Sequence, residues 1–304
     1  MADAYADCKQ VSAECPVSAS TFSYAPNLAG NVILMCVFLL CTLAQIGLAV
    51  AYRTVSFGSV VSIGCAMEVA GYIGRIMLHK NVWGSGMSLQ AIMLVIAPSF
   101  LAAGIFLTLK HIVVYLGPKY SRLPPRGWVW IFVTGDVIAV VLQGMGGGLA
   151  SGANTLKMVN TGNNIMLGGL AFGVVVQAFC ILLAFDFGYA LRKNKHEWKN
   201  DQKSDVSSKG FKFYAICTSF AFLFIWIRCI YRVPELAGGW GNPRMKKEAE
   251  FMVLDGMMIA FATILMTVAH PGVFFPAMGK RGRRRSGDQF LGSPAEEMSM
   301  LQNK

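Results

Sequence analysis

Seven long apolar runs are the feature that most constrains what this chain can fold into. Each run contains roughly 20 residues, the length of an α-helix that crosses about 30 Å of hydrocarbon. Only 14% of the 304 residues are charged, too few to give seven such runs a polar covering. The sequence therefore predicts an all-α polytopic membrane protein with seven transmembrane helices. The predicted spans are 29–52, 57–77, 89–110, 128–150, 164–190, 211–231 and 251–276.

The segments outside the runs are too short to bury a core of their own. We therefore expect three parts: an external tail at 1–28, a seven-helix transmembrane domain at 29–276, and a cytoplasmic polybasic tail at 277–304. The composition of the last part, rich in Gly, Ser, Pro and Glu beyond the basic run, is typical of disorder. The first residues lack the basic start and apolar stretch of a cleavable signal peptide, so the first span is expected to act as the targeting signal.

Lys and Arg are distributed unevenly between the two sides of the predicted bundle. Seventeen lie on the side of the C-terminus and seven on the side of the N-terminus. Because cytoplasmic loops retain basic residues, the N-terminus is predicted outside and the C-terminus in the cytoplasm. This bias accounts for the net charge of +11 without a nucleic-acid partner. The basic run at 280–285 is expected to contact anionic membrane lipids.

Two of the eight cysteines lie outside the spans. Cys8 and Cys15 are seven residues apart in the predicted external tail, where the oxidising environment favours a disulfide between them. Two free thiols on the tail are the alternative. The other six cysteines lie within spans, where they act as small apolar residues. The chain has no Cys-x-x-Cys pair or Cys/His cluster, so no metal or other cofactor is expected.

Polar and ionisable side chains inside the spans are the strongest functional signal, because each costs roughly 2.5 to 3.5 kcal/mol to insert when charged. Helical spacing places two sets of them on single helix faces. These polar stripes either bind a ligand or pair with one another to hold the bundle together. The first stripe is Glu68, Tyr72 and Arg75 in the second span, and the other is Asp136, Gln143 and Gly147 in the fourth.

The sixth span carries two arginines near its end, Arg228 and Arg232. Pro234 disfavours a helical conformation in the residue before it, so we expect the helix to end near Arg232. Long arginine stems can lie along apolar surface while their guanidinium groups reach the interface. The two arginines are therefore expected to direct their charges towards the outer membrane surface.

The carboxylates near these arginines suggest ion pairs between helices. Asp255 lies about one turn inside the last span, and Glu68 lies in the second. We expect Arg228 and Arg232 to pair with one of these two carboxylates. Glu235 is then expected to stay free and to meet a cationic head group at the outer interface.

In their order along the chain, these motifs resemble a known family. The motifs are 68–75, Asp136 with Gln143 and 146–148, 228–235, Glu248, Asp255 and 270–272, and they cover roughly residues 24 to 272. The chain resembles the fungal lipid-translocating exporters, the seven-helix group named for resistance to aminocholesterol and to sphingoid long-chain bases. It departs from the family pattern at Pro234, where many relatives carry another residue such as Ala, and at Met252, where a Tyr is expected.

The resemblance implies a fungal source, a role in moving or protecting against amphipathic lipids, and a membrane location. The plasma membrane is favoured over an endomembrane or the vacuole. We therefore expect a non-enzymatic protein that binds and translocates sphingoid long-chain bases or similar lipids and confers resistance to toxic lipids or drugs. The candidate ligand-binding residues are Glu68, Tyr72, Arg75, Asp136, Gln143, Arg228, Arg232, Glu235 and Asp255.

Other seven-helix classes fit the sequence less well. A receptor or sensor for such lipids is the alternative, although the third span lacks Asp-Arg-Tyr and the last lacks Asn-Pro-x-x-Tyr. A retinal protein is excluded because residues 251–276 contain no Lys. The four histidines lie at span ends or in loops on different sides, which argues against a membrane zinc hydrolase. His270, directly before Pro271, is expected to cap a helix.

Overall fold

A computed structural model describes residues 8, 10–20, 22–153, 155–194, 209–238 and 242–275. The lipid contact expected of residues 280–285 and the disorder expected of the C-terminal tail lie outside the described residues.

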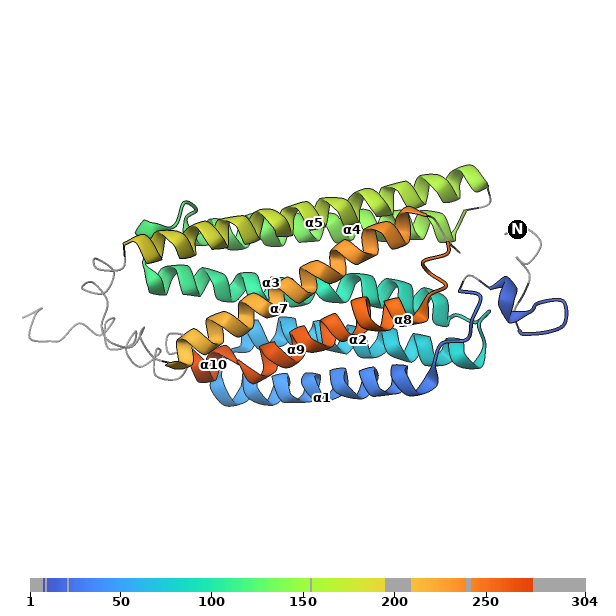
Figure 1. The fold of residues 1–304 in the computed structure, drawn as a ribbon, viewed down its shortest axis with the longest axis horizontal. Helices are drawn as coiled ribbons and strands as arrows, with labels where there is room; N and C mark the ends of the chain where they lie inside the picture. Colours follow the sequence, from blue (N-terminus) through green and yellow to red (C-terminus); the bar gives the residue numbers. More distant parts are fainter. Residues whose placement is uncertain are drawn as a thin grey trace, which may run out of the picture.

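Seven apolar helical segments, each long enough to cross a membrane, make up the described chain, and no strand occurs among its described residues. This confirms the predicted all-α, seven-span, multi-pass membrane architecture (Figure 1). The seventh segment is interrupted by a π-helical turn, η5. The segments are α1 (Leu28–Tyr52), α2 (Val55–Lys80), α3 (Gly86–Leu116), α4 (Pro125–Ser151), α5 (Leu156–Lys193), α7 (Lys209–Ala237), and the series α8 (Glu248–Phe251), η5 (Met252–Met257), α9 (Met258–Val268) and α10 (Pro271–Phe274).

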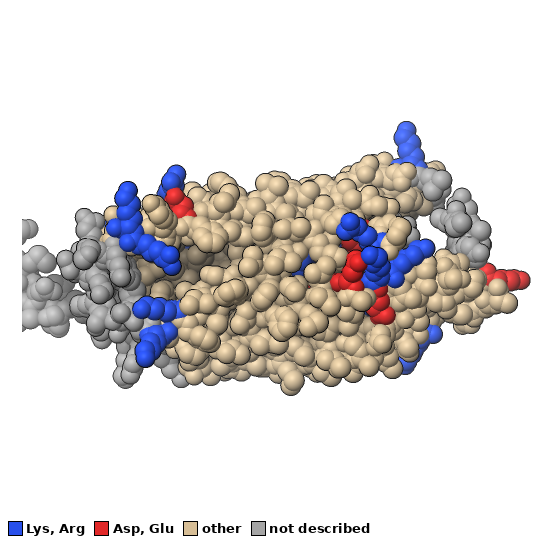
Figure 2. Space-filling view, viewed as in Figure 1, with Lys and Arg blue, Asp and Glu red and all other residues tan. Residues whose placement is uncertain are grey.

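The helices form a closed ring in chain order. Each of α1, α2, α3, α4, α5 and α7 packs on the next, and α9 returns to α1. In addition, α3 contacts α7 across the ring, so these two helices divide its interior. On the face shown in Figure 2, charged side chains gather at the two ends, and the body between them is almost entirely uncharged. Large apolar side chains such as Leu40 and Val50 are exposed on the bundle, as expected of a surface that lies against lipid.

Several helices extend beyond the predicted spans. The fifth span was predicted from residue 164, whereas α5 begins at Leu156, where the Thr155 side chain accepts a hydrogen bond from the backbone N–H of Met158 at 3.4 Å. Hydropathy identifies the part of a helix that lies in hydrocarbon, and polar end turns with a cap add to that length. His270 likewise caps α10, because its Nδ1 accepts from the Gly272 N–H at 3.1 Å, which confirms the predicted capping role.

The predicted end of the sixth span is wrong. Helix α7 continues through Pro234 to Ala237. A proline inside a helix removes the hydrogen bond to the carbonyl four residues earlier, which ordinarily kinks or breaks the helix. Here two side-chain contacts support the helix around Pro234: Arg232 donates to Glu235 of the same helix at 2.8 Å, and the Asn242 amide donates to the Glu235 carbonyl. The conformational preference of the residue before a proline takes no account of such side-chain contacts.

Helices α4 and α5 approach each other through glycines. A Cβ atom on Gly162 would lie 2.6 Å from the backbone oxygen of Gly146 and 2.6 Å from the backbone nitrogen of Ala150. Real Cβ atoms essentially never come so close. The glycines therefore allow α4 and α5 to pack closely.

The N-terminal tail packs against one end of the bundle, which we call the N-terminal end. Its Cys8 and Cys15 are joined by a disulfide. The Trp83 indole donates to the Cys15 carbonyl at 3.2 Å, and the Asn27 N–H donates to the Glu248 carboxylate at 2.6 Å. Burial of Tyr24, another residue of the tail, raises the pKa of its phenol above the ordinary value. The tail therefore covers this end of the ring.

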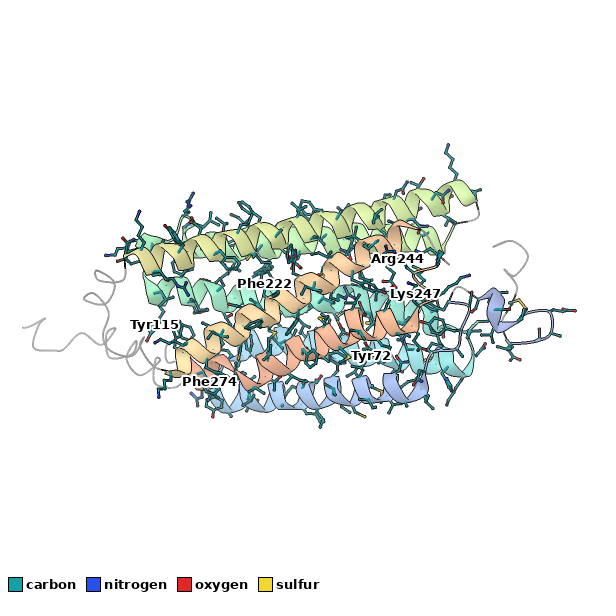
Figure 3. All side chains as sticks on the ribbon, in the orientation of Figure 1. Tyr72, Tyr115, Phe222, Arg244, Lys247 and Phe274 are labelled. Atoms are coloured by element: carbon teal, nitrogen blue, oxygen red, sulfur yellow. A yellow bond between two sulfur atoms is a disulfide. The ribbon has the colours of Figure 1, made fainter. Side chains whose placement is uncertain are left out.

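The orientation of the bundle in the membrane leads to the first prediction. Arg244 and Lys247 lie at the N-terminal end, in the connection between α7 and α8 (Figure 3). Because basic residues are more than twice as numerous on the other side, reporters at Lys304 should be cytoplasmic, and tags near Cys8, Lys157 and Lys246 should be external. Protease protection of each tag in intact cells measures this. An external signal at Lys304 would contradict the predicted orientation.

Candidate functional site

Buried charged side chains gather in the half of the bundle nearer the N-terminal end. Three arginines and three carboxylates of this group are each less than 10% exposed. They come from α2, from α7 and from the π-helical turn of the seventh segment, so the group connects elements that lie far apart in the sequence. We call it the charge cluster; its members are Glu68, Arg75, Arg228, Arg232, Glu235 and Asp255.

Asp255 is the centre of the charge cluster. The Nε atom of Arg228 lies 2.7 Å from its Oδ1. Arg232 donates from Nε to the same oxygen at 2.9 Å and from Nη2 to Oδ2 at 3.2 Å. One carboxylate therefore binds both arginines of α7. The sequence predicted such a pairing with either Glu68 or Asp255, and the structure shows that the partner is Asp255.

A π-helical turn places Asp255 at this position. π-Helical turns are rare and frequently occur at functional sites. The next residue, Gly256, lies against α2, and a Cβ atom on it would be 2.6 Å from the Tyr72 hydroxyl oxygen. A side chain at position 256 would therefore push the turn away from α2.

Arg228 also binds a backbone carbonyl that a proline leaves free. Pro98, inside α3, has no N–H, so the carbonyl of Leu94 four residues earlier lacks its helical donor. The Nη2 atom of Arg228 donates to this carbonyl. Arg228 thus links α3, α7 and the seventh segment, because it binds both the Leu94 carbonyl and the Asp255 carboxylate.

The structure corrects the expected positions of the arginine head groups and of Glu235. Arg228 and Arg232 do not reach the interface: they are 2% and 9% exposed, because Asp255 supplies a buried counter-charge. Glu235 is not free. Since α7 continues past Pro234, Glu235 lies one turn after Arg232 on the same face, and their ion pair measures 2.8 Å.

Arg75 is held by a separate set of groups. It donates to the Asn31 side chain at 2.7 Å and to the Gln90 side chain at 3.3 Å, and its Nη2 lies 3.5 Å from the Glu248 carboxylate. Its guanidinium also lies 4.0 Å from the centroid of the Phe251 ring, in a cation–π contact. Asn31 and Gln90 were not among the residues predicted from the sequence, although polar side chains in apolar spans were the signal that could have found them.

Glu68 and Tyr72 lie in the interior without an ion pair among the described residues. The Glu68 Oε1 and the Tyr72 hydroxyl are buried and have no hydrogen-bond partner there. The Tyr72 ring stacks on Phe38 with centroids 5.5 Å apart.

When Glu248 is counted with the charge cluster, four carboxylates face three arginines, so the group carries one surplus negative charge when all are ionised.

An apolar pocket adjoins the charge cluster. Its volume of about 460 Å³ lies in the range of small-molecule sites. Arg232 and Glu235 form part of its wall, and Gln90 and Gln143 add two amides. Phe22 of the N-terminal tail also lines it. Most of the remaining wall is apolar and includes Ile92, Leu94, Val95, Ile96, Met166 and Leu236.

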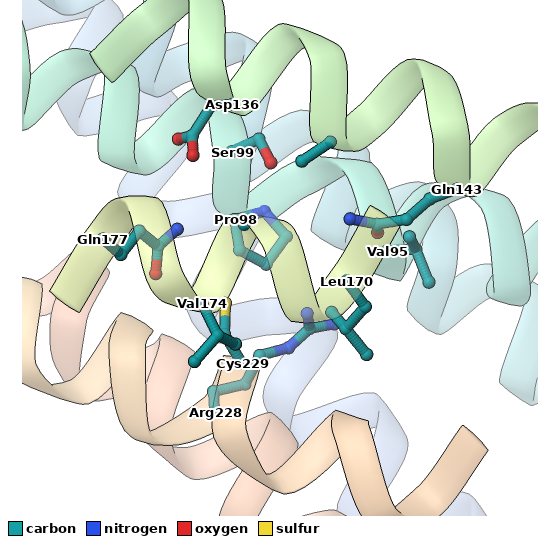
Figure 4. Close-up of a pocket in the computed structure, with 12 residues that line it drawn as sticks. Val95, Pro98, Ser99, Asp136, Gln143, Leu170, Val174, Gln177, Arg228 and Cys229 are labelled. Atoms are coloured by element: carbon teal, nitrogen blue, oxygen red, sulfur yellow. The ribbon is translucent and has the colours of Figure 1, made fainter. Parts of the chain in front are cut away.

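A second, smaller cavity lies between α3, α4, α5 and α7 (Figure 4). Asp136 and Gln143, two members of the predicted fourth-span stripe, both line it, as does Arg228. Gln143 and Val95 line the apolar pocket as well, so the two spaces adjoin. Gln177 of α5, which the sequence analysis did not single out, completes the polar lining. Among the described residues, no group of three or more His, Cys, Asp or Glu side chains could hold a metal ion.

Comparison with known proteins places this geometry in a family. The family model described as RTA1 like protein matches residues 61–278, more than half of the chain. The chain belongs to the RTA1-like family. The matched region includes every member of the charge cluster and both cavity glutamines, Gln143 and Gln177. This confirms the family resemblance inferred from the motifs.

Three yeast proteins illustrate what this RTA1-like chain is similar to. The sphingoid long-chain base transporter RSB1 of Saccharomyces cerevisiae is 32% identical over 242 residues, which cover 69% of this chain and 62% of the relative. Protein RTM1 and protoporphyrin uptake protein 1, from the same organism, are each 28% identical over 214 residues. Those matches cover 70% of this chain and 65% and 67% of the two relatives. No solved structure matches the chain.

Proposed function

We propose that this protein binds sphingoid long-chain bases or similar amphipathic lipids and translocates them across the plasma membrane, conferring resistance to toxic lipids, without enzymatic activity. The observation that carries the proposal is the pocket of about 460 Å³, whose wall is mostly apolar but includes Arg232 and Glu235 of the charge cluster. Such a wall suits a ligand with one charged end and one long apolar part. The similarity to the yeast sphingoid long-chain base transporter RSB1 supports the same lipid class.

The charge of the site favours a cationic head group. A sphingoid base carries a protonated amine and hydroxyl groups on a long hydrocarbon chain. Glu235 is the acidic residue of the charge cluster that reaches the pocket wall, where its carboxylate can bind the amine. Gln90 and Gln143 offer hydrogen bonds to the hydroxyl groups, while the hydrocarbon chain lies along the apolar wall.

Transfer between membrane leaflets tests the proposal directly. Purified protein in vesicles is expected to speed the transfer of a labelled sphingoid base above the rate in protein-free vesicles, with no partner protein added. A receptor for the same lipid would bind it without accelerating transfer. Binding without transfer would therefore favour the receptor alternative, and neither binding nor transfer would overturn the proposal.

Glu235→Gln is expected to weaken the binding of a sphingoid base by about tenfold or more, since hydrogen bonds to charged groups contribute about 1.5–3 kcal/mol. The variant should stay folded because Arg232 keeps both hydrogen bonds to Asp255. Binding of an N-acylated, uncharged sphingolipid should change little. Titration of the purified protein with both lipids measures the difference.

Glu250→Gln is the matched control for this variant. Glu250 also pairs with a basic residue, Lys247, at 2.6 Å, but both side chains are exposed and neither lines the pocket. Its substitution should leave both lipids unaffected. Equal losses for the charged and the uncharged lipid in Glu235→Gln would contradict the assignment of Glu235 to the amine.

A further inference from the structure

The cavity between α3, α4, α5 and α7 contains two acceptors that lack a donor. Asp136 is 3% exposed and its Oδ2 is buried without a hydrogen-bond partner. The Oε1 of Gln177, which lines the same cavity, is also buried without one. The cavity volume of about 20 Å³ is enough for one water molecule. The site therefore calls for a hydrogen donor that the described side chains do not supply.

The surrounding charges leave Asp136 without a direct counter-ion. From α7, Arg228 lines the cavity, but its guanidinium is bound to Asp255 and to the Leu94 carbonyl. The other titratable groups that face Asp136 are the thiols of Cys229 on α7 and Cys180 on α5; α3 contributes the uncharged Ser99.

No Lys or Arg forms an ion pair with Asp136 in the part of the chain that the structure describes. A buried, unpaired carboxylate is so costly that such a group takes up a proton instead. Protonation would turn one of its acceptor oxygens into a donor.

We propose that Asp136 is a reversible proton-binding site, with one water molecule in the cavity between Asp136 and Gln177. The proton adds to a carboxylate oxygen to form the neutral acid, and on release it returns to water, so no other reactant is needed. A Ca²⁺ or Mg²⁺ ion would take about six or more oxygen ligands, more than Asp136, Gln143, Gln177 and Ser99 provide. The ligand of this cavity is therefore a proton.

The proton site adjoins the apolar pocket, since Gln143 lines both spaces. If the pocket holds a cationic lipid, as the proposed function requires, the positive charge of that lipid favours ionised Asp136 through the weakly screened interior. Lipid binding should then release the proton. The proton site itself does not depend on the proposed function, whereas this coupling does.

Infrared spectroscopy of the purified protein tests the proton site. The wild type should show the carbonyl band of a buried protonated carboxyl that disappears reversibly as the pH is raised. Asp136→Asn, which has nearly the same shape and is neutral, should lack this band. If the asparagine variant does not fold, Asp136→Glu provides the test, because it should shift the band. Asp186→Asn is the matched control, because Asp186 is a partly exposed aspartate paired with Arg122. Protonated-carboxyl bands that are unchanged in both Asp136 variants would overturn the proposal.

Adding lipid during the same measurement separates the two proposals. A sphingoid base should diminish the Asp136 band in the wild type, and an uncharged sphingolipid should not. A base that binds without changing the band would overturn the coupling. A base that does not bind, while the band still titrates, would overturn the proposed function and leave the proton site established.

Discussion

Arg228→Ala is expected to remove most of the folded protein. The substitution takes away the 2.7 Å ion pair with Asp255 and the side-chain donor to the Leu94 carbonyl freed by Pro98. Arg232 still binds Asp255 in this variant, but the buried group loses one of its three arginines. Removing one partner of a buried pair costs about 3 to 5 kcal/mol. This loss is comparable with the entire stability of many proteins, about 5 to 15 kcal/mol.

The yield of monodisperse protein after extraction and its thermal midpoint in detergent measure this loss. Arg122→Ala is the matched control: Arg122 pairs with Asp186 at the same 2.7 Å, but its side chain is 74% exposed. Such exposed pairs contribute about 1 kcal/mol or less, so that variant should remain close to wild type. Equal yields for the two alanine variants would mean that Arg228 does not support the bundle as its contacts indicate.

The seven spans could be predicted because each depends on local composition alone. An apolar run of sufficient length must be helical in lipid whatever its neighbours are, since only a helix satisfies every backbone group within one segment. The same reasoning identified the buried polar stripes, because Glu68 and Arg75 lie on one helix face at any rotation of α2. The chain order of the motifs, taken as a whole, was sufficient to indicate the family.

The partners of these residues could not be predicted in the same way. Asp255 reaches both arginines through a π-helical turn, and Arg228 reaches α3 only because Pro98 frees the Leu94 carbonyl. Neither feature follows from hydropathy. The error about Glu235 has one cause, the expectation that Pro234 ends α7, because a helix one turn longer brings Glu235 back beside Arg232.

The pocket could not be predicted from the sequence, since its shape depends on how α3, α4 and α7 are arranged in space.

The free volume of the pocket can be reduced without disturbing the helix packing. Gly144 and Gly148 of α4 both line the pocket, and a Cβ atom on either would meet nothing within 4 Å. They are one helical turn apart and therefore share a face. A large side chain at either position would extend into open space instead of into a neighbouring helix.

Gly148→Phe is therefore expected to lower the rate of lipid transfer in vesicles by more than tenfold, while the protein folds normally. The phenyl ring would occupy space that the hydrocarbon chain of the lipid needs, and replacing a helix-interior glycine does not weaken the helix, because glycine has the lower helix propensity. Gly144→Phe should act in the same way, and the double variant should show no transfer above protein-free vesicles.

Gly168→Phe is the matched control for these variants. Gly168, on α5, likewise has nothing within 4 Å of a built Cβ atom, but it does not line the pocket. A phenylalanine there should leave transfer unchanged, which separates the blocked pocket from a general effect of a bulky residue on the bundle. The contrary result would be a Gly148→Phe protein that is monodisperse and equals Gly168→Phe in both thermal stability and lipid transfer. It would show that the lipid takes another route through this fold.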